Sequence, residues 1–155
     1  EVFKKFICLD IVRHAKRVAV YMSNENEIDT YPIIEWLSLQ EKKIFLPVMV
    51  ERSLIFCAYR HRGLIRSKFN ILEPNPATSV VIEPEMLDIL VVPLVAFDNN
   101  LCRLGRGGGY FDRALAHLDQ HEKKPYLVGL AYHMQRIADC EPKSHDVKMD
   151  FIITP

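Results

Sequence analysis

The chain has 155 residues, of which 49% are apolar, and its 20 Lys and Arg balance its 20 Asp and Glu. This length suits a single domain with a hydrophobic core. A formal net charge of zero predicts no broadly basic surface, so we do not expect a nucleic acid partner. The longest apolar run, ILVVPLVAF, is too short to span a membrane and is interrupted by Pro93. We expect no membrane partner either, and we favour a monomer.

The four cysteines, Cys8, Cys57, Cys102 and Cys140, form no CxxC pair and match no zinc-site spacing. A domain of this size does not need disulfide bonds, so we expect free thiols and a cytoplasmic location. No signal peptide is evident in the first residues. Because the chain begins with Glu1 rather than Met, a targeting segment before it stays an open alternative.

The first forty residues predict a helix, a strand and a second helix. Apolar residues recur at helical spacing over residues 1–16. RVAVYMS, residues 17–23, is apolar and β-branched and predicts a buried strand. Thr30 is a candidate N-cap, and Pro32 falls in the first turn of a helix that extends to about Gln40. The inward side chains of that helix are predicted to be Ile33, Ile34, Trp36 and Leu37.

The middle of the chain is dominated by strand signals. KKIFLPVMV (42–50) and SLIFCAYR (53–60) predict two strands that the dipeptide at 51–52 joins as a hairpin. Residues 63–84 contain three prolines and two short strand-like fragments, which indicates a long irregular crossing. DILVVPLVAFD (88–98) is the most apolar stretch and predicts a central parallel strand that is covered on both faces.

The last third alternates between strand and helix signals. A turn at residues 99–100 and a glycine-rich loop lead to a helix predicted at residues 110–120. YLVGLAY (126–132) and MDFIITP (149–155) predict two more strands. Strands that alternate with helices predict one α/β domain over residues 1–155. We expect a three-layer sandwich in which helices cover both faces of a mostly parallel mixed sheet.

The most informative stretch is LGRGGGYFDR (104–113), which holds four of the six glycines of the chain. It follows an apolar strand and opens a helix, the arrangement in which backbone N–H groups and a helix N-terminus bind phosphate. Arg103, Arg106 and Arg113 would add charge-assisted contacts to phosphate oxygens. Asp112 would hold Mg²⁺ beside them. The spacing matches neither the Walker motif nor the dinucleotide fingerprint, so a flexible turn is the alternative.

RLGRGGGYFDR (103–113) closely resembles the signature Arg-Leu-Gly-x-Gly-x-Gly-Tyr-Tyr-Asp-Arg of the 5-formyltetrahydrofolate cyclo-ligases. Four further segments resemble parts of the same family: EIDTYPII (27–34), ILEPNP (71–76), VVPLVAFD (91–98) and HDVKMDFIIT (145–154). Together they follow the family order over nearly the whole chain. The glycine signature is specific, whereas each of the other segments alone would be weak.

This resemblance implies an enzyme that closes a ring in 5-formyltetrahydrofolate, with or without a polyglutamate tail. The products would be 5,10-methenyltetrahydrofolate, ADP and phosphate. ATP and Mg²⁺ would be required, and the formyl oxygen would pass through an iminophosphate. Such a phosphoryl transfer needs positioning and charge neutralisation rather than a protein nucleophile.

The resemblance also implies roles for particular residues. Asp112 and Asp146 would hold Mg²⁺, Glu27 would hydrogen-bond the pterin ring, and Met22 would pack against it. Arg106, Tyr110 and Asp112 would act in catalysis. The residues that would wrap the ATP phosphates are Arg103, Leu104, Gly105, Arg106, Gly107, Gly108, Gly109, Tyr110 and Phe111. The segment from Arg106 to Tyr110 would also face the reacting formyl group.

The sequence departs from the family pattern in two places. Many members carry Lys where this chain has Gly108. The family's N-terminal helix, with a Lys and an Arg that contact ATP and substrate, would by the spacing to Glu27 precede Glu1. Without that helix, a folate- or nucleotide-binding module without catalysis is one alternative. A relative of sugar-phosphate isomerases or CoA-transferases with a similar sheet is the other. In a simpler interpretation, Glu27 is a solvated acid, Asp112 a helix-dipole partner and Asp146 a turn residue.

Overall fold

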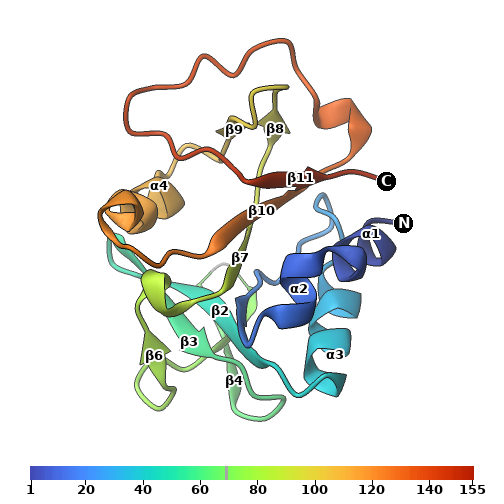
Figure 1. Cartoon of the computed structure of the whole chain (residues 1–155). Coiled ribbons are helices and arrows are strands. Elements are labelled where there is room, and N and C mark those ends of the chain that lie inside the picture. The colour runs from blue at the N-terminus through green and yellow to red at the C-terminus, as the bar shows by residue number, and fades with distance from the viewer. Residues whose placement is uncertain (69) are drawn as a thin grey trace.

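A seven-stranded sheet forms the centre of the computed structural model, which describes residues 1–68 and 70–155 (Figure 1). The strands lie in the order β11-β10-β7-β1-β2-β3-β6. Neighbours from β11 to β2 are parallel, whereas β3 is antiparallel to β2 and to β6. This arrangement confirms the mostly parallel mixed sheet. The strands are β1 (Arg17–Ala19), β2 (Lys43–Val50), β3 (Ser53–Ala58), β6 (Val81–Ile82), β7 (Ile89–Val92), β10 (Tyr126–Leu130) and β11 (Phe151–Ile153).

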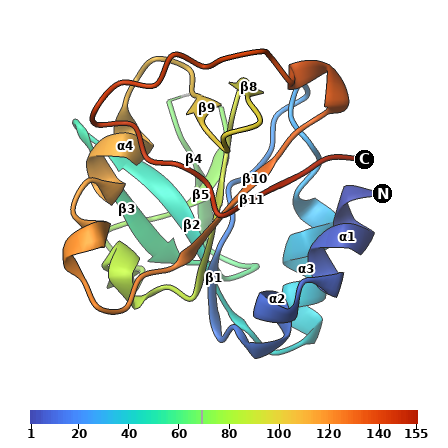
Figure 2. The same cartoon turned by 45° about the horizontal axis from the view of Figure 1, so that its top comes forward.

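Helices cover both faces of this sheet, as the α/β pattern predicts. The helices are α1 (Val2–Cys8), α2 (Asp10–His14), α3 (Tyr31–Leu39) and α4 (Tyr110–Leu115). Three 3-10 turns are η1 (Pro84–Met86), η2 (Leu118–Gln120) and η3 (His133–Gln135). Figure 2 shows α1, α2 and α3 together on one side of the sheet, while α4 lies on the other side. Leu115 of α4 and Leu118 of η2 pack against Leu90 and Val92 of β7.

The prediction of a central apolar strand is confirmed for its first half. All four residues of β7 are buried, and the strand lies between β1 and β10. The predicted strand over 88–98 does not continue, because Pro93 has no N–H with which to extend the sheet. The chain instead forms a small antiparallel hairpin from β8 (Ala96–Phe97) and β9 (Arg103–Leu104).

Two predicted elements near the N-terminus are shorter than expected. The helix predicted over 1–16 is interrupted at Leu9, whose backbone is extended, so that α1 and α2 are separate. The strand predicted over 17–23 ends at Ala19. Thr30 occupies the N-cap position of α3, but its side chain does not cap the helix. Its hydroxyl instead donates to the carbonyl of Tyr21 at 2.7 Å, which holds the residues after β1 against α3.

Three predictions further along the chain also need adjustment. The hairpin of β2 and β3 is confirmed. The crossing predicted over 63–84, of which residue 69 lies outside the described residues, contains a hairpin of β4 (Leu64–Arg66) and β5 (Leu72–Pro74) before β6. The predicted helix over 110–120 is divided in the structure. The α-helix α4 ends at Leu115, and the 3-10 turn η2 follows it. Over the described ranges, no helix is both long and apolar enough to cross a membrane.

The chain between β10 and β11 forms a long connection across the top of the molecule in Figure 1. It is fixed to the β8–β9 hairpin by backbone hydrogen bonds, among them Ile137 N–H to Phe97 O at 2.8 Å and Met149 N–H to Leu101 O at 2.9 Å. The connection between β10 and β11 thus places its residues beside the glycine-rich loop, where the functional site lies.

The four cysteines of the chain are free thiols, as predicted.

Candidate functional site

A cleft of about 1120 Å³ lies where the parallel strands end. The chain segments after β1, β7 and β10 all contribute to it, as is usual for ligand sites in open α/β sheets. The glycine-rich loop forms one wall, and residues of β2, β3 and the β4–β5 hairpin form an apolar wall. Every residue to which the family resemblance assigned a role lines this cleft: Met22, Glu27, Asp146 and all ten residues from Arg103 to Asp112. Arg113, the third arginine proposed from the loop pattern to contact phosphate, lines a smaller neighbouring cavity instead.

The glycine-rich loop connects β9 to α4 and contains two residues with left-handed backbone. Gly107 has φ +86° and Gly109, the N-cap of α4, has φ +64°, conformations that residues with a Cβ rarely adopt. A Cβ at Gly108 would lie 2.9 Å from the ring of Tyr110, and one at Gly109 would lie 2.8 Å from Arg113 Nη1. The loop therefore requires glycine for its own conformation, independently of any ligand.

Arg103 and Asp112 form an ion pair at the base of this loop. Arg103 Nη2 donates to Asp112 Oδ1 at 2.9 Å, and the Arg103 side chain is only 3% exposed. Burial lowers the pKa of the Arg103 guanidinium, and the charges of Asp112 and Asp146 oppose that change. Among the described residues, Arg103 Nε has no hydrogen-bond partner, although it is buried. Arg103 thus brings a buried positive charge to the cleft.

Arg106 and Glu27 form a second ion pair across the cleft. Arg106 Nη2 donates to Glu27 Oε1 at 2.9 Å, and the Arg106 side chain is 63% exposed. The other oxygen of Glu27 accepts from the backbone N–H of Asn24 at 3.0 Å. The sequence predicted Glu27 and Arg106 in different roles, and the structure places them in direct contact. The Glu27 side chain is only 13% exposed, but its partner lies largely in solvent. Ion pairs in contact with solvent typically contribute about 1 kcal/mol or less to stability, so a ligand can replace the contact.

The aromatic residues after the glycines point in different directions. Tyr110 OH donates to the carbonyl of Glu51 in the β2–β3 turn at 3.2 Å. Phe111 packs against the hydrophobic core beside α4 while also lining the cleft. Met22 likewise lines the cleft and packs against the core on the opposite face of the sheet. These three side chains contribute apolar surface beside the polar loop.

Asp112 and Asp146 are suitable ligands for a magnesium ion that also binds phosphate. Mg²⁺ is commonly held by one or two carboxylates, with phosphate oxygens and waters completing its shell. Asp112 Oδ1 accepts from Arg103 and, at 3.3 Å, from Val147 N–H, whereas within the described ranges no hydrogen bond engages Oδ2. Asp146 accepts from Lys143 N–H at 2.7 Å. No cluster of three or more His, Cys, Asp or Glu suited to a metal occurs in the described part of the chain. The donor set therefore fits a metal that arrives with phosphates, not a closed protein cage.

Comparison with known proteins identifies the family. The model of the 5-formyltetrahydrofolate cyclo-ligase family matches residues 1–155, which is the whole chain. This chain belongs to the 5-formyltetrahydrofolate cyclo-ligase family. The match confirms the resemblance that the glycine signature indicated, and it makes the protein a member of a family of ligases.

Similar proteins cover most of the chain. The 5-formyltetrahydrofolate cyclo-ligase of Escherichia coli K12 is 35% identical over 145 residues, which are 91% of this chain and 79% of that protein. The cyclo-ligase of Haemophilus influenzae is 37% identical over 141 residues, 88% of this chain and 74% of that one. The solved structure of 5,10-methenyltetrahydrofolate synthetase from Aquifex aeolicus covers 99% of this chain and 75% of its own, with TM-score 0.82 and 30% identity.

Some residues around the site were not singled out from the sequence. Asp98 is buried and binds three backbone N–H groups of the segments that flank the cleft. Tyr21 is a buried phenol that lines the cleft, and its pKa is raised by burial and by the charge of Glu27. The bonds from Asn100 and Cys102 to Asp98 are local, and an Asp before a turn is the signal that could have indicated them. The bond from Cys140 joins residues 42 positions apart, and no local pattern predicts it.

Proposed function

We propose that this cyclo-ligase family member converts 5-formyltetrahydrofolate to 5,10-methenyltetrahydrofolate in a reaction that uses ATP and Mg²⁺. The observation that carries the proposal is the composition of one cleft. It combines a glycine-rich loop, the buried Arg103–Asp112 pair, two carboxylates suited to Mg²⁺, and Glu27 next to an apolar wall. These groups match two substrates that bind side by side, one that carries phosphates and one that has a flat, hydrogen-bonding ring.

In the proposed complex, the loop from Arg103 to Phe111 surrounds the ATP phosphates. Its backbone N–H groups and the guanidinium groups of Arg103 and Arg106 stabilise the charge on the phosphate oxygens. Asp112 and Asp146 hold Mg²⁺, which when bound neutralises charge on the transferred phosphoryl group. Because Arg103 is buried and already paired with Asp112, its orientation is set before ATP binds.

The pterin ring occupies the side of the cleft that contains Glu27 and Met22. A carboxylate can accept two hydrogen bonds from the donor edge of a pterin, and Met22 packs against its face. Glu27 contacts Arg106 in the structure, so Arg106 moves from Glu27 toward the reacting groups when substrate binds. Its exposed side chain has the freedom to do so.

The chemistry then proceeds in two steps. The formyl oxygen attacks the γ-phosphorus, an O–P bond forms, and the bond from that phosphorus to the bridging oxygen of ADP breaks. Nitrogen 10 next attacks the formyl carbon of the resulting iminophosphate, the C–O bond breaks with departure of phosphate, and the proton of nitrogen 10 leaves with that phosphate. Arg106 and Tyr110, with the loop N–H groups, face the formyl group in these steps. None of them forms a covalent bond to the substrate.

A spectroscopic assay tests this function. Protein mixed with 5-formyltetrahydrofolate, ATP and Mg²⁺ is expected to produce the near-ultraviolet absorption band of the methenyl product. The increase should require both ATP and Mg²⁺, and ADP should appear in equal amount. Binding of both ligands by folded protein without product would contradict the proposal and identify a non-catalytic binding module. Turnover of a sugar phosphate without ATP would instead identify an isomerase.

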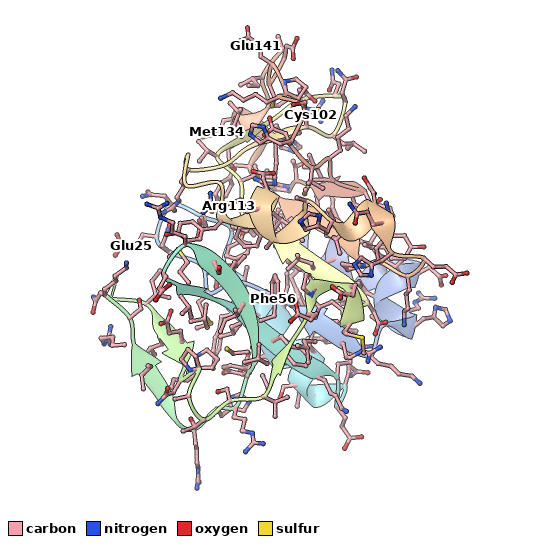
Figure 3. The ribbon with its side chains drawn as sticks, turned by 90° about the vertical axis from the view of Figure 1, so that its left-hand side faces the viewer. Glu25, Phe56, Cys102, Arg113, Met134 and Glu141 are labelled. Carbon is pink, nitrogen blue, oxygen red and sulfur yellow. The ribbon has the colours of Figure 1, made fainter. Side chains whose placement is uncertain are left out.

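Glu27→Gln is expected to raise the KM for 5-formyltetrahydrofolate by about 10-fold or more, because hydrogen bonds to a charged acceptor are worth about 1.5–3 kcal/mol. The KM for ATP should change much less. Steady-state kinetics with each substrate varied in turn measure both values. Glu25→Gln is the matched control, since Glu25 is an exposed acid in the same loop (Figure 3). Equal KM values in the two variants would remove Glu27 from the folate site.

A further inference from the structure

Arg113 makes a set of contacts that the proposed reaction does not use. From α4, its Nη1 donates to the carbonyl of Gly108 at 2.8 Å. Its Nη2 donates to the carbonyl of Arg52 in the β2–β3 turn at 3.1 Å. The guanidinium also lies over the ring of Tyr110, with Cζ 4.9 Å from the ring centroid. One side chain therefore joins the glycine-rich loop to the turn of a neighbouring hairpin.

These contacts separate Arg113 from the other arginines of the signature. Arg103 and Arg106 line the main cleft, whereas Arg113 lines a smaller neighbouring cavity of about 260 Å³ with Gly109, Asp112, Ala116 and His145. The sequence predicted a phosphate contact for Arg113. In the structure, the guanidinium donates to two backbone carbonyls and does not line the main cleft, which favours a role within the protein over a phosphate contact.

The bond to Gly108 controls the direction of a neighbouring donor. A trans peptide plane places the carbonyl of one residue and the N–H of the next on opposite sides. Arg113 holds the carbonyl of Gly108 toward itself, so the N–H of Gly109 faces away from Arg113. The position of the guanidinium also requires glycine at residue 109, because a Cβ there would lie 2.8 Å from Arg113 Nη1. The left-handed backbone of Gly109 and the position of the guanidinium thus depend on each other.

The bond to Arg52 couples the two walls of the cleft. Met49 and Leu54, which flank the β2–β3 turn, line the apolar wall. Tyr110 binds the same turn through Glu51, so two residues of α4 attach the loop to it. Figure 3 shows Arg113 on α4 beside the hairpin that contains Phe56.

We propose that Arg113 is a positioning residue, which orients the glycine-rich loop for the ATP phosphates by fixing the Gly108 carbonyl to the β2–β3 turn. The proposal rests on the proposed function for the identity of the ligand. Arg113 itself touches neither ATP nor folate. Its effect is exerted through the backbone of the loop.

The test compares Arg113→Ala and Arg113→Lys with Arg52→Ala. Arg113→Ala is expected to raise the KM for ATP by about 10- to 100-fold, the range for lost charge-assisted hydrogen bonds. Arg113→Lys should recover little, because an ammonium group does not reproduce the planar fork that reaches two carbonyls. Arg52→Ala removes a positive charge from the same turn but leaves the carbonyl that Arg113 uses, so its KM for ATP should stay within about 2-fold of the unmodified protein.

Free guanidinium provides a readout that a general loss of stability would not produce. In Arg113→Ala, the neighbouring cavity opens into the space of the lost side chain. Low concentrations of guanidinium chloride should therefore restore a large part of kcat/KM for ATP, while sodium chloride at equal ionic strength should not. Absence of rescue, or an unchanged KM for ATP in Arg113→Ala, would overturn the proposal.

The same variants separate this inference from the proposed function. Hydrogen exchange of the loop amides requires no turnover, and it should be faster in Arg113→Ala and slower again with guanidinium. If the unmodified protein makes no product but shows this pattern, the proposed function fails and the positioning role stands. If the protein is active and loop exchange is unchanged in Arg113→Ala, the positioning role fails and the function stands.

Discussion

Asp112→Ala is expected to reduce kcat/KM for the cyclisation by about 10²- to 10³-fold. This is the loss typical of removing one electrostatic contact to a transition state. Two effects combine. The variant loses one of two proposed Mg²⁺ ligands, and it leaves the guanidinium of Arg103 buried without its partner. An uncompensated buried charge also lowers the free energy of unfolding by about 3–5 kcal/mol.

Asp112→Asn separates these two effects. The asparagine oxygen can still accept from Arg103 and from the N–H of Val147, which Asp112 Oδ1 does in the structure. The negative charge that would hold Mg²⁺ is absent. We therefore expect Asp112→Asn to be more stable than Asp112→Ala and to retain a similar loss of activity.

The kinetic measurement needs a matched control and a varied metal concentration. Asp119→Asn removes a carboxylate in η2 that is 86% exposed and pairs with Lys124, so activity and stability should change little. Raising the Mg²⁺ concentration should partly restore Asp112→Asn if the residue is a metal ligand. Activity of Asp112→Asn close to that of Asp119→Asn would show that Asp112 has no such role.

The fold could be predicted largely from local patterns, because its central elements have local causes. The four apolar residues of β7 predict a strand buried on both faces, and they are fully buried between two parallel neighbours. Pro32 and the apolar spacing after it predict α3, which begins at Tyr31. The prediction of one strand over 88–98 was wrong after Pro93, where β8 pairs with β9 and not with the main sheet. Which partner a short strand selects depends on tertiary contacts that its own residues do not encode.

The candidate site could likewise be predicted only where its residues are adjacent in sequence. The residues from Arg103 to Asp112 are adjacent in sequence, so a single motif predicts that they share one wall of a cleft. The contact between Glu27 and Arg106 joins residues 79 positions apart, and only the folded chain shows it. The contacts of Arg113 could not be predicted for a related reason. An arginine beside a glycine-rich loop suggests a phosphate ligand. The acceptors of Arg113 in the structure are backbone carbonyls, and a pattern of side chains does not predict such contacts.

Asp98 is the structural link between the glycine-rich loop and the connection that carries Asp146. The residue is 1% exposed, and its carboxylate accepts from the backbone N–H groups of Asn100 at 2.8 Å, Cys102 at 3.1 Å and Cys140 at 3.0 Å. Cys102 directly precedes β9, which leads into the loop, and Cys140 belongs to the connection between β10 and β11. A single buried acceptor thus holds both segments in place beside the cleft.

Asp98→Ala is expected to lower the free energy of unfolding by about 3 kcal/mol, because buried N–H groups without an acceptor cost about 1–3 kcal/mol each. This loss corresponds to a decrease in Tm of roughly 6–12 °C for a chain of this length. Urea unfolding at neutral pH measures it. Asp139→Asn, at an exposed acid in the same connection, should change the free energy by less than about 0.5 kcal/mol.

The contribution of Asp98 should also depend on pH in a direction that follows from its hydrogen bonds. The N–H of Cys140, followed by those of Asn100 and Cys102, lowers the pKa of the Asp98 carboxyl, although burial opposes them. Because the pKa is lower in the folded chain, the unfolded chain binds the proton first as the solution is acidified. The stabilisation is therefore complete above the ordinary carboxyl pKa of about 3.9 and is lost as pH falls through the lowered value. Asp98→Asn should lack this part of the acid dependence, so the difference in unfolding free energy between it and the unmodified protein should shrink as pH falls from neutral. A constant difference between the two proteins at every pH would show that the charge of Asp98 does not stabilise the fold.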